Sequence, residues 1–405
     1  MAGEIETRER TAGGRGPMFW LFGMLPLVLL AGLLALFAKI GPAGVFEAAF
    51  PPIEELTIER IYFTEGGIGV EVVNGGPEEV TIAQVTVDEA LWQFTAEPDA
   101  VLGRLDRATL SIPYPWSEGE PHSVVLISAN GVTFEKVAEV AALSPVPDGR
   151  YFATFTLLGV YVGVIPVLMG LLWYPFLRRL TDRWLNFFLS FTVGLLLFLG
   201  VDAVDESLDF AGEVAAAFQG VALVAAGIVL AFLAVSAVDR SRKVVAGAAG
   251  ASTLVLVYSI AVGIGLHNLG EGLVIGAAYT GGSIALGTML VVGFAAHNTT
   301  EGLAIAAPLA RMEGRVSGLV KHLLAAGLIA GMPAILGTWL GGFAFSPIWS
   351  TLFLAIGAGA IFQVVWQITR MMGRKPEGSV FAMLNAAGVA LGILVMYGTG
   401  LLLVS

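Results

Sequence analysis

Two copies of a short polar pattern stand inside consecutive apolar stretches of the chain. The first reads His267-Asn268-Leu269-Gly270-Glu271-Gly272, and the second, thirty residues later, reads His297-Asn298-Thr299-Thr300-Glu301-Gly302. Residues four apart lie on one face of a helix, so each histidine is expected to stand over the glutamate of its own copy. Such side chains are costly in hydrocarbon, and two sets on neighbouring membrane helices indicate a functional site between them.

These residues have the chemistry of a metal site. Neutral imidazole and carboxylate together suit Zn²⁺ and also Fe²⁺, Mn²⁺ or Co²⁺. The chain has no cysteine, which excludes a thiolate site. The four predicted ligands are His267, Glu271, His297 and Glu301. The competing interpretation is that these polar residues only join neighbouring helices by hydrogen bonds. The complete second copy, with its own carboxylate, favours the metal.

The elements that must position these residues belong to a membrane protein. Of the 405 residues, 56% are hydrophobic and 13% are charged, whereas charged residues make up about a quarter of a soluble domain. The mean hydropathy is +0.82. The formal net charge of -11 argues against nucleic acid as a partner. We therefore predict an all-α polytopic membrane protein whose partner is the lipid bilayer.

A polar tail of residues 1–17 precedes an apolar run from about Met18 to Ile40. This run is long enough to cross a hydrocarbon core of about 30 Å. A cleaved signal peptide is the alternative, but its apolar region is shorter, about 7 to 15 residues. We predict an uncleaved transmembrane anchor over residues 18–41, with a cytoplasmic tail before it and an extracytosolic region after it.

Residues 50–148 have the composition of a small inserted β-sandwich, in which segments rich in Val, Ile and Thr alternate with turn signals. The predicted strands are Leu56–Phe63, Gly69–Val73, Val80–Val87, Thr109–Ile112 and Val124–Ile127. The region holds 17 acidic and 4 basic residues, a balance of 4 - 17 = -13. A solvated acidic surface explains this charge, and concentration of cations near a pore is the alternative. Its one histidine, His122, has no ligand cluster in the sequence.

Residues 151–405 are nearly continuous apolar sequence. Eight spans are predicted, at residues 152–177, 184–206, 214–237, 252–279, 284–310, 322–343, 349–369 and 380–404. Lys and Arg occur in alternate loops, and the loops at 207–213, 280–283 and 344–348 have none. By the positive-inside rule the N-terminus is cytoplasmic, while the sandwich and the C-terminus are extracytosolic. Nine helices in all fit this pattern.

The two HNxxEG motifs resemble those of the ZIP (Zrt/Irt-like) divalent metal transporters, especially the prokaryotic branch with the motif in both the fourth and fifth core helices. The resemblance covers about residues 151–405. It implies an eight-helix core in which helices one to three and six to eight form inverted repeats around helices four and five. It also implies that the His and Glu quartet holds the transported metal, while Asn268 and Asn298 face a second site that shares both glutamates.

The sequence departs from the family pattern at three places. The proline before each glutamate is replaced by Gly270 in one motif and by Thr300 in the other. A hydroxyl in the second motif, on Thr299 or Thr300, can instead bond a carbonyl one turn back and bend the helix. Where the sixth core helix of the family often has Glu-Pro, this chain has Met332-Pro333, so a full binuclear centre is not expected.

Two further groups are candidates for the path of the metal. Asp202, Asp205 and Glu206 close the second core helix on the external side, where they can collect metal at the entrance or form a solvated helix end. Gln363, with Gln367 one turn on, can contact the permeating metal or bond a neighbouring helix.

The predicted function is transport of a divalent metal, zinc or a related ion such as iron or manganese, across the plasma membrane toward the cytoplasm. Its only expected ligand is the transported ion, with no prosthetic group and no enzymatic activity. A metal-dependent intramembrane hydrolase and a non-transporting metal sensor are the alternatives. Oligomeric state is left open, with a homodimer as one option.

Overall fold

The computed structural model describes residues 17–40, 54–246, 249–280, 284–312, 318–373 and 379–404. The chain divides into two units, residues 1–52 and 53–405, and each is described by itself. In the first unit, helix α1 spans Pro17–Ile40, which agrees with the helix predicted at this place. The predicted polar tail lies outside the described residues, apart from Pro17.

The first part of the second unit is a β region of two antiparallel sheets. Its strands are β1 (Leu56–Thr64), β2 (Gly67–Asn74), β3 (Val80–Val87), β4 (Ala90–Trp92), β5 (Thr95–Glu97), β6 (Val101–Leu102), β7 (Arg107–Ile112), β8 (His122–Ser128) and β9 (Thr133–Ala138). One sheet has the order β1-β2-β7-β5, and the other has the order β4-β3-β8-β9 with β6 paired to β3. All five predicted strands are present, and each lies within the bounds of an observed strand.

The two sheets share one hydrophobic core. Val70 and Leu110 from the first sheet and Val85 and Leu126 from the second are fully buried in the same cluster. Successive side chains on a strand point to opposite faces, so the alternating apolar residues face inward and the polar ones outward. This face-to-face packing is that of the predicted sandwich.

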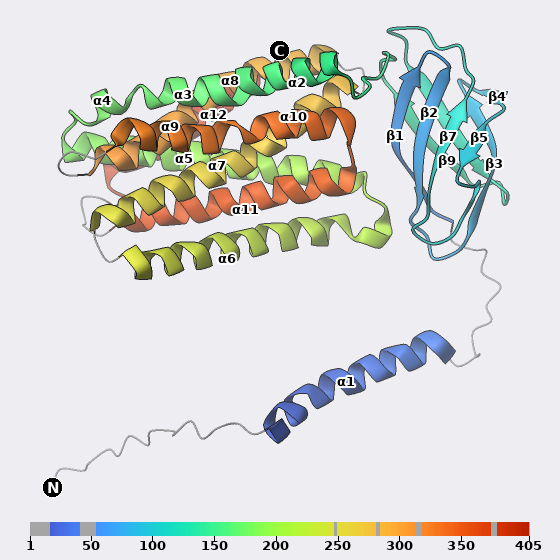
Figure 1. Cartoon of the computed structure of the whole chain (residues 1–405), viewed down its shortest axis with the longest axis horizontal. Helices are drawn as coiled ribbons and strands as arrows, with labels where there is room; N and C mark the ends of the chain where they lie inside the picture. The colour runs from blue at the N-terminus through green and yellow to red at the C-terminus, as the bar shows by residue number, and fades with distance from the viewer. Residues whose placement is uncertain are drawn as a thin grey trace. The chain divides into compact units, whose positions relative to one another are not determined.

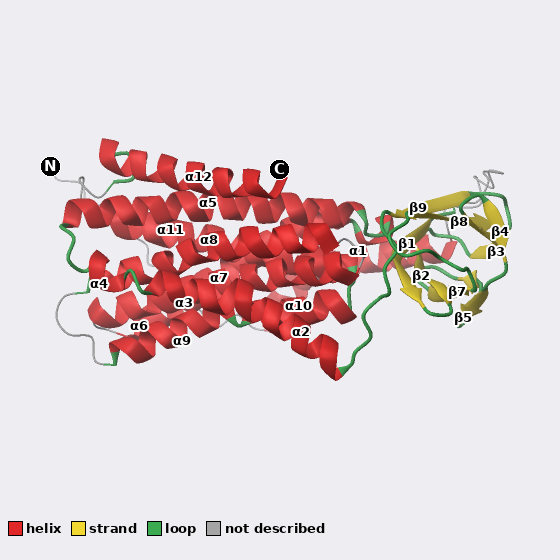
Figure 2. Cartoon of the chain, turned by 90° about the horizontal axis from the view of Figure 1, so that it is seen from above, coloured by secondary structure: helices red, strands yellow, loops and turns green. Residues whose placement is uncertain are grey.

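The remainder of the second unit is helical (Figures 1 and 2). Its elements are α2 (Gly149–Gly159), the π-helical turn η1 (Val160–Val164), α3 (Ile165–Leu171), α4 (Tyr174–Leu177), α5 (Asp182–Gly212), the 3-10 turn η2 (Ala216–Phe218), α6 (Gly220–Ala246), α7 (Ala249–Thr280), α8 (Ile284–Ala310), α9 (Leu319–Gly331), α10 (Pro333–Phe343), α11 (Pro347–Met372) and α12 (Met383–Val404). Helix is present at each of the eight predicted spans.

Six helical segments in the described residues are long and apolar enough to cross a membrane, as an integral membrane protein requires. They are residues 149–177, 182–212, 216–238, 253–280, 319–343 and 347–372. Helices α1 and α12 contribute shorter apolar segments, Met24–Leu36 and Met383–Gly398. Helix α8 is not among the six. The nine-span topology therefore stays a prediction.

Two spans, here called the broken spans, depart from regular α-helix near a proline, although each runs on as one helical segment. In the first, the π-helical turn η1 separates α2 from α3, and Pro166 is the second residue of α3. In the sixth, α9 ends at Gly331 and α10 begins at Pro333. Proline has no N–H to donate to the preceding turn, so both breaks leave backbone carbonyls that need other donors.

The glycine that ends each motif is required by close helix packing. A Cβ at Gly272 of α7 would lie 2.2 Å from the carbonyl oxygen of Ala334 on α10. A Cβ at Gly302 of α8 would lie 2.2 Å from the carbonyl oxygen of Val167 on α3. Small residues let helix backbones approach this closely. Each motif helix is therefore pressed against one of the two broken spans.

Candidate metal centre

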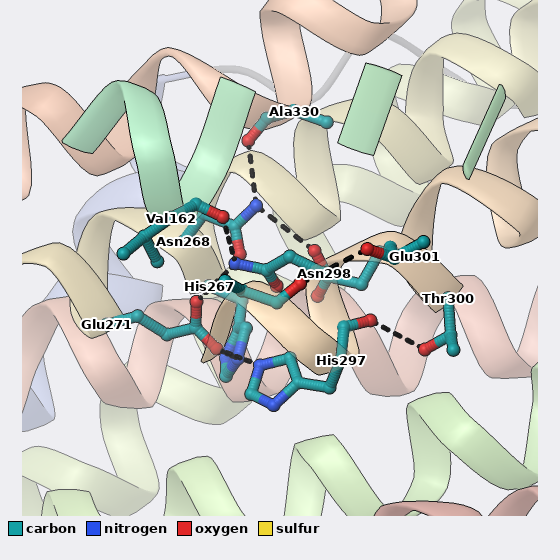
Figure 3. A network of polar contacts seen from close by, with 11 residues as sticks. Val162, His267, Asn268, Glu271, His297, Asn298, Thr300, Glu301 and Ala330 are labelled. Carbon is teal, nitrogen blue, oxygen red and sulfur yellow. Dashed lines mark hydrogen bonds and ion pairs between the residues drawn. The ribbon is translucent and has the colours of Figure 1, made fainter. Parts of the chain in front are cut away.

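Three of the predicted ligands form a compact buried group between α7 and α8 (Figure 3). One ligand atom each from His267, Glu271 and His297 lies within 4.8 Å of the other two. The exposed fractions of these residues are 3%, 1% and 6%. Helical spacing places His267 over Glu271, as predicted, and the packing of α8 against α7 brings in His297.

Glu271 is the acceptor at the centre of this group. Its Oε1 accepts from His267 Nε2 at 3.0 Å and also from His297 Nε2. An ionised carboxylate only accepts hydrogen bonds, so both imidazoles donate from Nε2 in this arrangement. A divalent cation would meet two nitrogens and one oxygen here once each imidazole carries its proton on Nδ1 and offers Nε2 as a ligand.

The two asparagines connect the motifs crosswise. Asn268 Nδ2 donates to Glu301 Oε2 at 3.1 Å, and Asn298 Nδ2 donates to Glu271 Oε2 at 2.9 Å. Each asparagine therefore holds the glutamate of the other motif. Because all four side chains are buried, these bonds determine the orientation of both carboxylates.

The same asparagine amides also bond the broken spans. Asn298 Nδ2 donates to the carbonyl of Val162 in η1 at 3.1 Å, and Asn268 Nδ2 donates to the carbonyl of Ala330 in the last turn of α9 at 3.0 Å. In a regular helix the N–H of residue 166 would serve the Val162 carbonyl, but Pro166 has none. These carbonyls were not among the predicted site residues, although Pro166 in the first span was a signal for one of them.

Several buried atoms of the cluster have no hydrogen-bond partner among the described residues. They are His267 Nδ1, Asn268 Oδ1, Asn298 Oδ1 and Glu301 Oε1. A buried polar atom without a partner costs about 1–3 kcal/mol, and such groups are rare in native structures. The three oxygens are acceptors, and a cation would satisfy them.

Glu301 belongs to the cluster but not to the compact group. It is 4% exposed and is bound by Asn268, whereas the three closely spaced residues are His267, Glu271 and His297. The structure thus brings together three of the four predicted ligands at metal-binding distances. The role of Glu301 as fourth ligand stays a prediction.

The two threonines of the second motif both bond the preceding turn of α8. Thr300 Oγ1 donates to the carbonyl of His297 at 2.6 Å, and Thr299 Oγ1 donates to the carbonyl of Ala295 at 3.2 Å. These are the predicted bonds to the preceding turn. Helix α8 nevertheless runs without a break through the motif. Met332 is 51% exposed at the break between α9 and α10.

The acidic residues of α5 interact with the cluster over a longer range. Asp202 interacts electrostatically with His267, His297 and Glu271, and Glu206 interacts with Glu271. Asp205 interacts electrostatically with both Asp202 and Glu206.

Gln363 is 2% exposed on α11, and its Oε1 has no partner among the described residues. Gln367, one turn further along the helix, is 7% exposed and equally lacks a partner for its amide. A place for Gln363 on the metal path stays a prediction.

A second polar cluster lies in the β region. Asp88 Oδ2 accepts from Tyr114 Oη and from His122 Nδ1, both at 2.7 Å, and Asp88 Oδ1 accepts from the Ser123 N–H. Burial raises the pKa of Asp88, but these hydrogen bonds outweigh it and leave the pKa below its ordinary value. The bond to Asp88 raises the pKa of Tyr114 to about 12. His122 at the start of β8 is thus bonded to a carboxylate in the turn between β3 and β4.

The cluster between α7 and α8 has the donor set of a site for a divalent transition metal, with buried imidazole nitrogen and carboxylate oxygen. Its amides position the carboxylates, which is the usual arrangement around a metal site. Neither a scan against protein-family models nor a search of curated protein sequences finds a match to this chain.

Proposed function

We propose that this protein transports divalent transition-metal ions, zinc or iron in preference and manganese as a further candidate, across the plasma membrane toward the cytoplasm. The observation that carries the proposal is the buried group of His267, Glu271 and His297 at the contact of two apolar helices. Ionisable residues within membrane helices generally mark an ion path. No catalytic activity and no prosthetic group are part of the proposal.

The position of the cluster along its helices supports transport. His267 lies near the middle of α7, and His297 lies near the middle of α8. In transporters the ion site lies near the bilayer midplane, with broken helices beside it. The breaks at η1 and at Pro333 are both bonded to this cluster through Asn298 and Asn268.

The helix pairing supports a ZIP-like core of eight helices after an N-terminal anchor and an inserted sandwich. The first span packs on α8 through Gly302, and the sixth span packs on α7 through Gly272. Each pair joins one motif helix to one proline-broken span. This correspondence is what two repeats arranged around the fourth and fifth core helices would produce.

The proposed path begins at α5. Asp202, Asp205 and Glu206 gather the hydrated cation, and the electrostatic interaction of Asp202 with the motif histidines supports a path from α5 to the cluster. His267, His297 and Glu271 then replace water around the ion, each neutral imidazole binding it through Nε2 in the tautomer that carries the proton on Nδ1. Rocking of the broken spans against α7 and α8 opens the cluster toward the cytoplasm, where Gln363 is a candidate contact.

The test is metal uptake into proteoliposomes by a variant with both motif glutamates replaced, Glu271→Ala and Glu301→Ala. Uptake of Zn²⁺ and Fe²⁺ is expected to fall to the level of empty liposomes, because this variant lacks both Glu271, the acceptor shared by the two histidines, and Glu301. The matched control is Glu118→Ala with Glu120→Ala, which removes the same charge from an exposed loop of the β region. Wild-type uptake by the correctly folded motif variant would disprove the proposal.

A metal-dependent hydrolase is the second candidate, because a compact group of two histidines and one glutamate is also a catalytic zinc arrangement. The free Oε1 of Glu301 would then be the base. Flux and bound metal measured in one liposome preparation separate the candidates. A transporter moves many ions per protein without any other substrate, whereas a hydrolase retains its metal.

A further inference from the structure

A hollow of about 450 Å³ opens on the four-stranded sheet of the β region. Its walls come from the β1–β2 hairpin, the end of β7 and the link from β4 to β5. Strands β1, β2, β5 and β7 are labelled in Figure 1. Sites for small ligands commonly have volumes of about 300–1,000 Å³. The hollow has no part in the proposed metal path.

Four of its lining residues form one row across the sheet. Tyr62 on β1 pairs with Gly69 on β2, Gly69 pairs with Ser111 on β7, and Ser111 pairs with Thr95 on β5. Residues directly opposite on adjacent strands point to the same face of a sheet. Ile68, the neighbour of Gly69, lies in the core. The row therefore stands on the outer face, away from the second sheet.

The glycine in the middle of this row makes room for the ring of Tyr62. The ring of Tyr62 covers Gly69 so closely that a Cβ there would lie 2.1 Å from Tyr62 Cζ. At the hairpin, Gly67 has a φ of 137°, and a Cβ would lie 2.1 Å from the carbonyl oxygen of Ile112. Any larger residue at either place would displace these walls, so the hollow depends on both glycines.

The lining combines aromatic rings with uncharged polar groups. Tyr62 and Phe94 supply the rings, and hydroxyl or amide groups come from Thr64, Gln93, Thr95 and Ser111. The described lining contains no Lys, Arg, His, Asp or Glu. A metal would lack ligands there, and an anion would lack a cation to pair with.

The surroundings of the hollow also disfavour anions. Glu71 and Glu97 lie in the next row of the sheet and interact electrostatically with Tyr62, as does Arg60. Residues 50–148 hold 17 acidic and 4 basic residues. The field at the hollow is therefore negative or near neutral.

We propose that this hollow binds a neutral saccharide. The apolar C–H face of a sugar ring matches an aromatic side chain, and its hydroxyls match the hydroxyl and amide groups that line the rest of the hollow. An apolar ligand would leave those polar groups unpaired, at a cost in affinity. The β region is thus a saccharide-binding module, whatever ion the helices carry.

The test uses the full chain in a detergent without a sugar head group. Maltotriose, cellotriose and the trimer of N-acetylglucosamine are the neutral probes, a galacturonic acid trimer is the acidic probe, and an uncharged tripeptide is the third class. Saturation-transfer NMR locates the bound protons, and titration calorimetry measures affinity. At least one neutral trisaccharide is expected to bind saturably and more tightly than the acidic trimer and the tripeptide.

Ser111→Ala combined with Thr95→Ala should weaken that binding by roughly tenfold, since two hydrogen bonds are removed. Thr109→Ala is the matched control, because Thr109 lies on the same face of β7 but in the next row and outside the lining. Tyr62→Phe should bind better than Tyr62→Leu, which removes the aromatic face. Absence of saturable neutral-sugar binding, tighter binding of the tripeptide or acidic trimer, or equal effects of the lining and control changes would overturn the proposal.

Discussion

At the scale of single residues, the two motif glutamates have unequal environments despite their equal sequence positions. Glu271 accepts from both histidines and from Asn298. Glu301 accepts from Asn268 at one oxygen, and its other oxygen has no partner among the described residues. Glu271 is therefore the shared acceptor of the compact group, whereas Glu301 is bonded by Asn268 alone among the described residues.

The inequality predicts different effects of the same conservative change. Glu271→Gln removes the charged acceptor shared by both imidazoles, and we expect the Kd for Zn²⁺ to rise by more than about hundredfold. Glu301→Gln should raise it by only about tenfold, within the range for residues that support a metal site. Competition with a chelator on the detergent-solubilised protein measures both values, with Glu118→Gln as the control. Equal effects would show that the two carboxylates act as symmetric ligands.

At the scale of elements, the motif helices and the broken spans depend on each other through Asn298 and Asn268. Asn298→Ala would leave the buried Val162 carbonyl without a donor, which should cost about 1–3 kcal/mol of unfolding free energy. Pro166→Ala restores an N–H at the position that a helix would use to bond this carbonyl. The double variant should therefore recover about 1 kcal/mol relative to the sum of the single changes.

Unfolding of each variant in detergent, followed through a denaturant series, measures this coupling. Asn268→Ala combined with Pro166→Ala is the control pair, because Asn268 bonds Ala330 in the other broken span. The proline change should give that pair no recovery. Equal recovery of unfolding free energy in both double variants would mean that the Asn298 amide does not substitute for the N–H that Pro166 lacks.

The stability of the β region should fall at both low and high pH because of the hydrogen-bonded cluster of Asp88, Tyr114 and His122. The pKa of Asp88 is lowered in the folded state, so its stabilising contribution is present above its ordinary pKa of 3.8 and is lost as the pH falls further. The pKa of Tyr114 is raised to about 12, so its contribution is present below its ordinary pKa of 10.0 and is lost as the pH rises toward 12.

Calorimetric melting of wild type and Asp88→Asn tests these limits. The wild-type advantage in Tm of the β region should be full at neutral pH, should shrink below about pH 4, and should shrink again above about pH 10. Glu118→Gln, on an exposed loop, provides the comparison at each pH. A constant difference across the whole range would contradict the role of the Asp88 cluster.

Local sequence patterns predicted the helices and strands, but they did not predict contacts between residues far apart in the chain. The strand predicted at Val80–Val87 is β3, because alternation and turn residues are properties of neighbouring positions. The bond of Asn298 to Val162 joins residues 136 positions apart, and the pair of Asp88 and His122 spans 34 positions. Such contacts depend on how helices and sheets pack, which no local pattern contains.

The candidate site was predictable where chemistry repeats at helical spacing. His267 and Glu271 lie four residues apart on one helix, so their contact followed from geometry alone. The unequal roles of Glu271 and Glu301 did not follow, because they arise from the packing of α7 against α8. The hollow on the β region was missed because its row crosses four strands.

At the scale of the whole molecule, the direction of transport depends on which side of the membrane each loop faces. Arg178, Arg179 and Arg183 lie around the link between α4 and α5, and the positive-inside rule places this link in the cytoplasm. The β region would then lie outside, on the side from which α5 presents Asp202 and Glu206. Uptake toward the cytoplasm requires this orientation.

The absence of cysteine from the sequence makes the orientation directly testable. Asn130→Cys places one thiol in the exposed turn between β8 and β9, and Arg179→Cys places one in the exposed link before α5. A membrane-impermeant maleimide should label Cys at position 130 in intact cells and Cys at position 179 only after permeabilisation. The cysteine-free wild type gives the background. The reverse pattern would place the β region in the cytoplasm. The carboxylates of α5 would then lie at the exit of the path, and the proposed direction of flux would have to be inverted.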